Sequence, residues 1–213
     1  MPALSQTRFP RLWLLMQKTI GGNRSKQELV LRYYRKQPRI LEIGCSVGNV
    51  SDAFRDFAEI SYTGIDIDPN AIAVAKSRFH AHPNFNFELK SLADLAAQGQ
   101  QFDYVIFAGI LHHISDDIAA IMLADAMRVV APGGQIVISE PEALRPTDNL
   151  IFRLFYNLEQ GQFLRSRQHL ERLVAASGAE ISQLEDHLIS PGIVKAPFVA
   201  RFNLLVATPS ATG

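Results

Sequence analysis

A glycine-rich turn between an apolar run and a helix-like stretch is the first part of the sequence that could do chemistry. The apolar residues 40–43 lead into Gly44-Cys45-Ser46-Val47-Gly48. Glycines let the backbone turn tightly and let a ligand approach closely, and the start of a following helix offers unpaired N–H groups with a partial positive charge. Such a turn is typical of a nucleotide or anion site.

An acid at the end of the next apolar run supports this interpretation. Asp66 directly follows the run at residues 60–65, 22 residues after Gly44. A carboxylate at the end of the neighbouring strand can accept both hydroxyls of a ribose. The two strand ends together predict a pocket for an adenosine-type ligand at the carboxyl edge of a parallel sheet.

Two histidines and a glutamate are the candidates for proton transfer. His112 and His113 follow the fourth apolar run and Glu140 follows the fifth, so all three are expected at the same edge. A histidine there can take a proton from a hydroxyl or amine, or it can hold the loop through a hydrogen bond. Adjacent residues do not both face one pocket in a regular strand, so we expect one of the two histidines to be structural.

Four motifs, in order, resemble the class I S-adenosylmethionine-dependent methyltransferases, and the resemblance covers about residues 39–140. They are LEIGCSVG at 41–48, TGIDIDP at 63–69, FDYV through LHHISD at 102–116, and RVVAPGG at 128–134. The resemblance implies S-adenosylmethionine as cofactor and S-adenosylhomocysteine as its product. No His/Cys pair lies at zinc spacing, so we expect no metal.

The resemblance also implies a role for each matching position. Glu42, Gly44 and Gly48 would border the methionine half of the cofactor. Asp66 would hold the ribose diol, and Ile67 would pack on adenine. The complete set of implied cofactor-binding residues is Glu42, Gly44, Cys45, Ser46, Gly48, Asp66, Ile67, Ser91, Leu92 and Ala108.

Two positions depart from the family pattern. Ser46 stands where the family usually has glycine, and a positive φ there would cost about 1 kcal/mol or more. Ser91 stands near the place where the family commonly has an acid for the adenine amino group; Ser91 can accept one hydrogen bond, and Asp94 could substitute from the next turn.

The turn also matches the G-x-S-x-G nucleophile elbow of serine hydrolases, with Ser46 as nucleophile. Several strands precede the elbow in that fold, whereas only 43 residues precede Gly44, and they read as helix until Pro38. No feature places a late histidine such as His187 near Ser46. An NAD enzyme is disfavoured because the G-x-G-x-x-G pattern is missing.

The elements that must position these residues alternate between strand and helix. Expected strands are 39–43, 60–65, 85–89, 104–108, 135–139, 179–188 and 198–207; expected helices are 50–57, 70–79, 91–97, 117–130 and 168–177. This alternation predicts an α/β, Rossmann-like fold with a mainly parallel seven-stranded sheet, helices on both faces and an antiparallel last strand.

Two segments lie outside the alternation. Residues 1–36 are expected to form an N-terminal helical lid hinged at Gly21 and Gly22, and residues 37–213 the methyltransferase domain, with a cap-like insertion at about 141–177. The lid and the insertion would roof the acceptor pocket. An aromatic wall is expected from Phe152, Phe155, Tyr156 and Phe163.

The composition of the chain argues against two kinds of partner, nucleic acid and the membrane interior. Lysine plus arginine number 21, as do aspartate plus glutamate, so the chain lacks the positive excess that binds nucleic acid. The apolar run 12–16 is far shorter than the roughly 18 residues of a membrane span. The single cysteine, Cys45, fits a reducing cytoplasm. We expect a small-molecule partner, and a homodimer is one assembly that the sequence allows.

The expected activity is transfer of a methyl group from S-adenosylmethionine to oxygen, nitrogen or carbon of a small, partly apolar metabolite. The alternative is a protein that binds S-adenosylmethionine without transferring its methyl group. The departures at Ser46 and Ser91 motivate that alternative, and the serine hydrolase is a remote one.

Overall fold

The computed structural model describes residues 22–148, 161–189 and 200–210, together with Leu150, Arg153 and Tyr156. The helix expected before Gly21 lies outside these residues, as do Phe152 and Phe155 of the expected aromatic wall. Within the described chain, no helix combines the length and the apolar character needed to cross a membrane.

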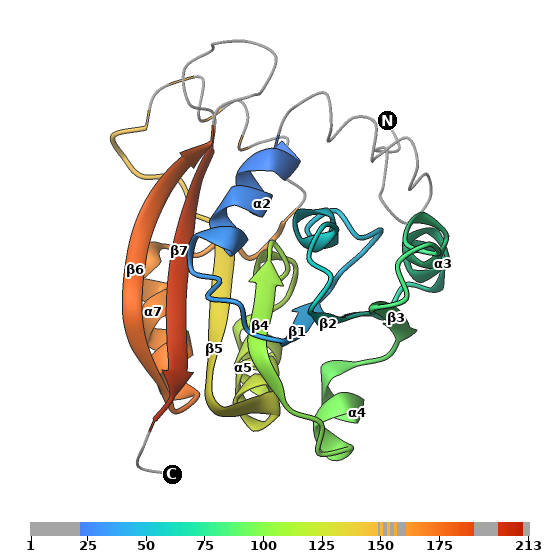
Figure 1. Cartoon of the computed structure of the whole chain (residues 1–213). Helices are drawn as coiled ribbons and strands as arrows, with labels where there is room; N and C mark the ends of the chain where they lie inside the picture. Colours follow the sequence, from blue (N-terminus) through green and yellow to red (C-terminus); the bar gives the residue numbers. More distant parts are fainter. Residues whose placement is uncertain are drawn as a thin grey trace.

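Seven strands form one sheet in the order β3-β2-β1-β4-β5-β7-β6 (Figure 1). They are β1 Arg39–Ile43, β2 Ser61–Asp66, β3 Phe85–Leu89, β4 Phe102–Ala108, β5 Val130–Pro141, β6 Ala179–Ile189 and β7 Ala200–Pro209. Strands β1 to β5 pair in parallel, whereas β7 runs antiparallel to both of its neighbours, β5 and β6. The predicted mainly parallel sheet with an antiparallel last strand is confirmed.

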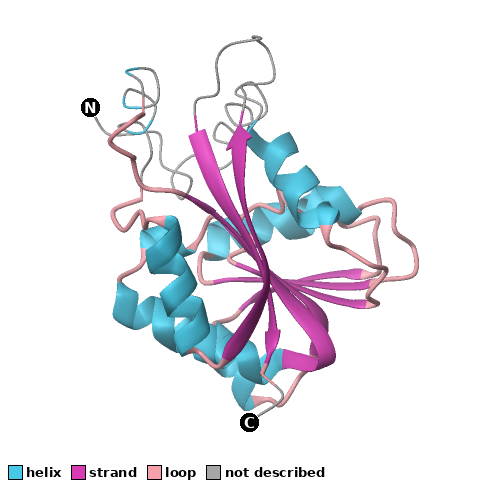
Figure 2. Ribbon diagram, turned by 90° about the vertical axis from the view of Figure 1, so that its left-hand side faces the viewer, coloured by secondary structure: helices cyan, strands magenta, loops and turns pink. Residues whose placement is uncertain are grey.

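Helices cover both faces of this sheet (Figure 2). They are α2 Gly22–Arg32, η1 Ser51–Phe54, α3 Pro69–Arg78, α4 Leu92–Ala97, η2 Leu111–His113, α5 Asp116–Val129 and α7 Arg167–Ala176. Helices α2 and α3 pack on one face, and α4, α5 and α7 on the other. In Figure 1, α2 crosses in front of β4 and β5, and α5 lies behind them.

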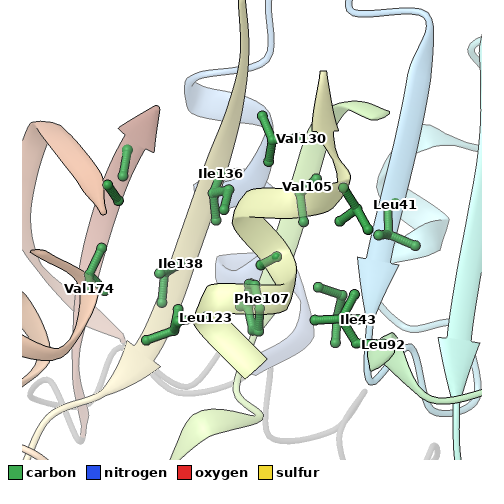
Figure 3. Close-up of a cluster of buried hydrophobic side chains, with 14 of the residues drawn as sticks. Leu41, Ile43, Leu92, Val105, Phe107, Leu123, Val130, Ile136, Ile138 and Val174 are labelled. Atoms are coloured by element: carbon green, nitrogen blue, oxygen red, sulfur yellow. The ribbon is translucent and has the colours of Figure 1, made fainter. Parts of the chain in front are cut away.

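The core explains why the central strands are continuously apolar. Along β1, Ile40 faces the α2 side of the sheet while Leu41 and Ile43 face the α5 side. Figure 3 shows the α5 side, where Phe107 and Ile138 of neighbouring strands approach α5. Because both faces are buried, the parallel strands are fixed in register and their carboxyl ends meet at one edge of the sheet.

Local capping fixes the chain just beyond that edge. The Asp68 side chain accepts a hydrogen bond from the Asn70 N–H, and Pro69 starts α3 at a position where its missing N–H costs nothing. Ser91 and Asp94 form a reciprocal capping box at the start of α4. Both helices therefore begin immediately after a strand, at the edge where β2 and β3 end.

Two elements differ from expectation. The helix expected at 50–57 is reduced to η1 by tertiary contacts, because the Ser51 hydroxyl donates to buried Glu42 and the side chain of Arg78 contacts Asp52. The last parallel strand begins at Val130, directly after α5, and its ladder with β4 is interrupted between Val130 and Gln135. Pro132, Gly133 and Gly134, the end of the fourth motif, occupy this irregularity.

Candidate functional site

The turn after β1 is built from left-handed backbone. Gly44, Ser46 and Gly48 have φ angles of 68°, 49° and 77°. The N–H groups of Gly44 and Cys45 both donate to the Ile65 carbonyl of β2, at 2.9 and 3.0 Å. Non-glycine residues rarely adopt such angles, so the serine stores strain where the sequence led us to expect it.

Side chains are excluded at both glycines of this turn. A Cβ on Gly44 would lie 2.4 Å from Cδ1 of Ile110, which follows β4. A Cβ on Gly48 would lie 2.8 Å from the Phe79 ring. The turn therefore requires glycine both for its backbone angles and for its close neighbours.

Asp66 connects this turn to the end of β2. Its Oδ2 accepts the Ser46 N–H at 2.8 Å, and its Oδ1 accepts the Asp68 N–H at 2.9 Å. Each carboxylate oxygen can accept a further hydrogen bond. The two segments that the sequence analysis paired are thus brought together, with acceptor capacity remaining on Asp66.

Apolar side chains are exposed on both sides of Asp66. Ile67 is 79% exposed, and Leu89, which pairs with Asp66 from β3, is 56% exposed. Ser91 and Asp94 are engaged with each other, the Ser91 hydroxyl donating to Asp94 at 2.6 Å. An apolar ring would cover the exposed side chains of Ile67 and Leu89. The hydrogen bond to adenine that we expected of Ser91 would compete with its capping bond to Asp94.

Three other residues implied in cofactor binding lie largely beneath the surface. The Leu92 side chain is buried in the core on the α5 side, so it presents no side chain to a ligand. Ala108 is half-buried at the end of β4. Burial and the charges of Glu42 and Asp66 raise the pKa of the Cys45 thiol well above its usual range.

Glu42 is a buried acid beneath the glycine turn. It accepts the hydroxyl protons of Ser51 and Tyr62 at 2.6 and 2.7 Å. Burial raises the pKa of Glu42 to about 7, and these two hydrogen bonds offset the effect only in part. Glu42 therefore supports the turn from below and carries a proton over part of the physiological range.

Glu140 holds the loop that contains the two histidines. Its Oε1 accepts the N–H groups of Ile110 and Leu111, both at 2.8 Å, and its Oε2 lies 2.7 Å from Nδ1 of His112. Burial alone would raise the pKa of Glu140, but the hydrogen bond and charge of His112 and the two backbone N–H groups outweigh it and lower the pKa. This pair is buried, with 4% of His112 and 3% of Glu140 exposed.

His113 is exposed, in contrast to His112, and the two rings lie 4.0 Å apart. The adjacent histidines therefore differ in environment: one contacts the buried acid and the other lies at the surface. This arrangement favours a loop-holding role for His112 and Glu140, and it leaves His113 as the ring accessible to a substrate.

Arg165 was not found by sequence reasoning, yet it holds the same loop. Its guanidinium donates to the carbonyls of Leu111 and Ile114 at 2.6 and 2.8 Å, and its Nε donates to Asp116.

Gly161 also contacts this loop. It lies against the buried imidazole of His112, where a Cβ would be 2.1 Å from Cδ2. Some 50 residues separate these partners in the chain, so no local pattern could have revealed them.

The comparison with known proteins agrees with this geometry. Residues 40–134 match a family model described as a methyltransferase domain. The resemblance to the class I S-adenosylmethionine-dependent methyltransferases is confirmed for this part of the chain. The matched region runs from β1 to the irregular start of β5, and so contains the glycine turn, Asp66 and the histidine loop.

Two curated relatives of this chain are named as methyltransferases. Over 104 residues it is 32% identical to a ubiquinone biosynthesis O-methyltransferase of Cereibacter sphaeroides, covering 47% of this chain and 40% of that protein. Over 102 residues it is 30% identical to a demethylmenaquinone methyltransferase of Tropheryma whipplei, covering 47% and 41%. Across the first relatives, the match spans 24% to 64% of their lengths.

Solved structures share the fold of this chain at low sequence identity. The pyocyanin biosynthetic protein PhzM superposes with a TM-score of 0.71 at 14% identity, over 94% of this chain and 58% of that one. The methyltransferase SibL gives 0.70 at 15% identity, over 99% and 60%.

The sheet order separates the residues of the hydrolase alternative. Ser46 follows β1 and His187 lies on β6, with β4, β5 and β7 between them. Four strand spacings amount to roughly 19 Å, far beyond hydrogen-bond reach. His187 instead lies 3.4 Å from a guanidinium nitrogen of Arg32. Ser46 and His187 therefore do not form one catalytic unit.

Proposed function

We propose that this protein transfers the methyl group of S-adenosylmethionine to oxygen, nitrogen or carbon of a small, partly apolar metabolite. The observation that carries the proposal is the arrangement around Asp66. This carboxylate joins the glycine turn to β2, retains acceptor capacity, and lies between the exposed apolar side chains of Ile67 and Leu89.

The described residues fit the cofactor. The left-handed turn at Gly44 and Gly48 allows close approach of an aminoacyl chain. Asp66 would accept the ribose hydroxyls, and Ile67 with Leu89 would cover the adenine ring, which explains why large apolar residues are exposed there. The site would be supported from below by three residues, Glu42, Cys45 and Ala108.

Methyl transfer depends more on the alignment of the acceptor with the methyl group than on acid–base groups. When bound, S-adenosylmethionine supplies an already activated methyl group. The protein must hold the acceptor in line with that group and exclude water. Glu140, His112 and Arg165 would do this by fixing the loop after β4, and His113 would be available to take a proton from an acceptor hydroxyl or amine.

The relatives support a small molecule as acceptor, since two of them are named for ubiquinone biosynthesis and demethylmenaquinone methylation. The balanced charge of the chain supports the absence of a nucleic acid partner. We place the activity in the cytoplasm and leave a homodimer as a candidate assembly, which light scattering on the purified chain would test.

Calorimetry with S-adenosylhomocysteine, followed by label transfer, tests the proposal. We expect micromolar binding, and Asp66→Ala should weaken it at least tenfold because hydrogen bonds to a charged group contribute about 1.5–3 kcal/mol. Asp117→Ala, on the exposed first turn of α5, is the matched control and should bind as the unmodified chain does. Equal affinity in both variants would contradict the assigned site.

Methyl transfer separates this proposal from a protein that only binds the cofactor. Labelled methyl groups should pass from S-adenosylmethionine into a protein-free cell extract. Binding without transfer would favour the alternative, a sensor or sequestering protein. Covalent capture of Ser46 by a fluorophosphonate would favour the hydrolase instead.

A further inference from the structure

We propose that Lys26 binds a negatively charged oxygen of the methyl acceptor, so that the acceptor is a small molecule carrying a negative charge at neutral pH. This inference rests on the proposed function and deepens it by naming the acceptor class. Three observations carry it: the position of Lys26, the absence of a counter-charge to Lys26 among the described residues, and a buried hydroxyl on the same face of the sheet.

Lys26 lies at the carboxyl edge of the sheet, beyond β4. Its Nζ is 2.9 Å from the point where a Cβ on Gly109 would lie, and the edge of the His112 ring is 3.6 Å from the same point. Gly109 has a φ of 75° and follows β4 directly. The ammonium group and the histidine loop therefore converge on one glycine.

The position of Lys26 points to the acceptor rather than to the cofactor. Its ammonium group lies over the Phe202 ring, 5.6 Å from the centroid, and Phe202 belongs to β7. Strands β4 and β5 separate β7 from β1, where the glycine turn and Asp66 form the cofactor site. The contact with Phe202 thus lies on the side of β4 that is remote from the residues that would hold the nucleoside.

No described residue supplies a counter-charge to Lys26. In the described part of the chain, its ammonium group makes no hydrogen bond or ion pair, although its side chain is half-buried. Glu28, the acid of the same helix, is paired with Arg24 at 2.9 Å. Apart from its contact with the Phe202 ring, this half-buried cation has no negatively charged neighbour among the described residues, and a ligand oxygen with a negative charge would stabilise it.

Ser139 supplies a second, independent observation. Its hydroxyl is buried and has no hydrogen-bond partner among the described residues. Along β5, Ser139 is two residues beyond Val137, whose side chain lies in the core on the α2 side, so the hydroxyl faces α2. Its carbonyl accepts the Gly109 N–H at 2.8 Å, which places it beside the glycine that Lys26 covers.

Together these groups have the chemistry that binds a negatively charged oxygen. Lys26 supplies charge and Ser139 supplies a hydroxyl donor. Helix α2 starts only four residues before Lys26, so the partial positive charge of its N-terminus acts in the same direction. A neutral acceptor would leave the cation and the hydroxyl unsatisfied.

Fractionated extract tests the inference directly. A protein-free cell extract is separated on an anion exchanger at pH 8, and each fraction is incubated with the full chain and methyl-labelled S-adenosylmethionine. We expect label to enter molecules from the retained fraction. Lys26→Met should lower kcat/KM for that fraction at least tenfold, and Lys26→Arg should restore most of the loss because it keeps the charge.

The control variant is Arg24→Met, which removes the same charge from the exposed, ion-paired side of the same helix and should transfer label at the unmodified rate. Affinity for S-adenosylhomocysteine should stay within twofold in Lys26→Met. Label entering only the unretained fraction, full activity of Lys26→Met, or a loss of S-adenosylhomocysteine affinity in that variant would overturn the inference. Absence of label from every fraction would instead contradict the proposed methyl transfer, on which the inference depends.

Discussion

Ser46 occupies a backbone conformation that favours glycine, with φ at 49°. Ser46→Gly should therefore raise the free energy of unfolding by about 1 kcal/mol, because the left-handed angle no longer opposes a Cβ. Its N–H, which donates to Asp66, is kept. Urea denaturation checks the stability, and we expect label transfer to persist. Loss of transfer in this variant would mean that the hydroxyl itself takes part in the reaction.

Glu42 makes the stability of the protein depend on pH. Its pKa in the folded chain is about 7, against an ordinary value of 4.5, so the folded state holds the proton more tightly than the unfolded state. The resulting stabilisation is complete below about pH 4.5 and is lost as the pH rises to about 7. The difference corresponds to about 3 kcal/mol.

Urea denaturation at pH 5 and pH 8 tests this dependence, with Glu42→Gln as the matched variant. Glutamine can still accept hydrogen bonds from Ser51 and Tyr62 but does not titrate. The stability of the unmodified chain relative to this variant should fall between the two pH values. A difference that stays constant would show that Glu42 is ionised in both conditions.

The loop after β4 depends on a glycine far away in the chain. Gly161→Ala would place a methyl group 2.1 Å from Cδ2 of His112, and such overpacking typically costs about 1–3 kcal/mol. We expect turnover to fall while S-adenosylhomocysteine affinity is retained, because the loop positions the acceptor and not the nucleoside. Urea denaturation and label transfer measure the two effects.

Gly178→Ala is the control for this substitution. A Cβ there meets nothing within 4 Å, so only its φ of 82° opposes the change, at about 1 kcal/mol. If Gly161→Ala were no more harmful than this control and kept full turnover, the loop would not need its present position.

The strands could be predicted because the residue pattern that favours each strand lies within a short stretch of the sequence. Strands buried on both faces need continuous apolar residues, and β1 matches its expected bounds of 39–43. The edge strand β3, whose buried and exposed residues largely alternate, matches its expected bounds of 85–89. The helix expected at 50–57 was less predictable, because the contact between Ser51 and Glu42 that reshapes it joins two separate elements.

The burial and the contacts of the side chains in the candidate site could not be predicted from the sequence. The motif places Glu140 at the correct edge, but only the fold reveals that it is buried against His112. Lys26 and Arg165 carry no motif at all. Their partners, Phe202 and Leu111, are distant in the chain, and a single sequence contains no record of such contacts.

Ligand binding should stabilise the entire protein if the glycine turn and Asp66 form one site. At a S-adenosylhomocysteine concentration of 100 times Kd, linkage adds about 2.7 kcal/mol to the free energy of unfolding. For a domain of this size, the melting temperature should rise by about 5–10 °C. Differential scanning fluorimetry measures this, with NAD as the control ligand. An equal rise with NAD would indicate a different nucleotide specificity.

The position of β7 has a consequence for how the chain is made. β7 is the last described strand in sequence, yet it pairs with β5 on one side and β6 on the other. During synthesis, therefore, β6 leaves the ribosome before the strand that joins it to the sheet exists. Until residues 200–209 emerge, β5 presents an open edge that a second nascent chain could pair with. Chaperone demand during translation should be greatest in that interval.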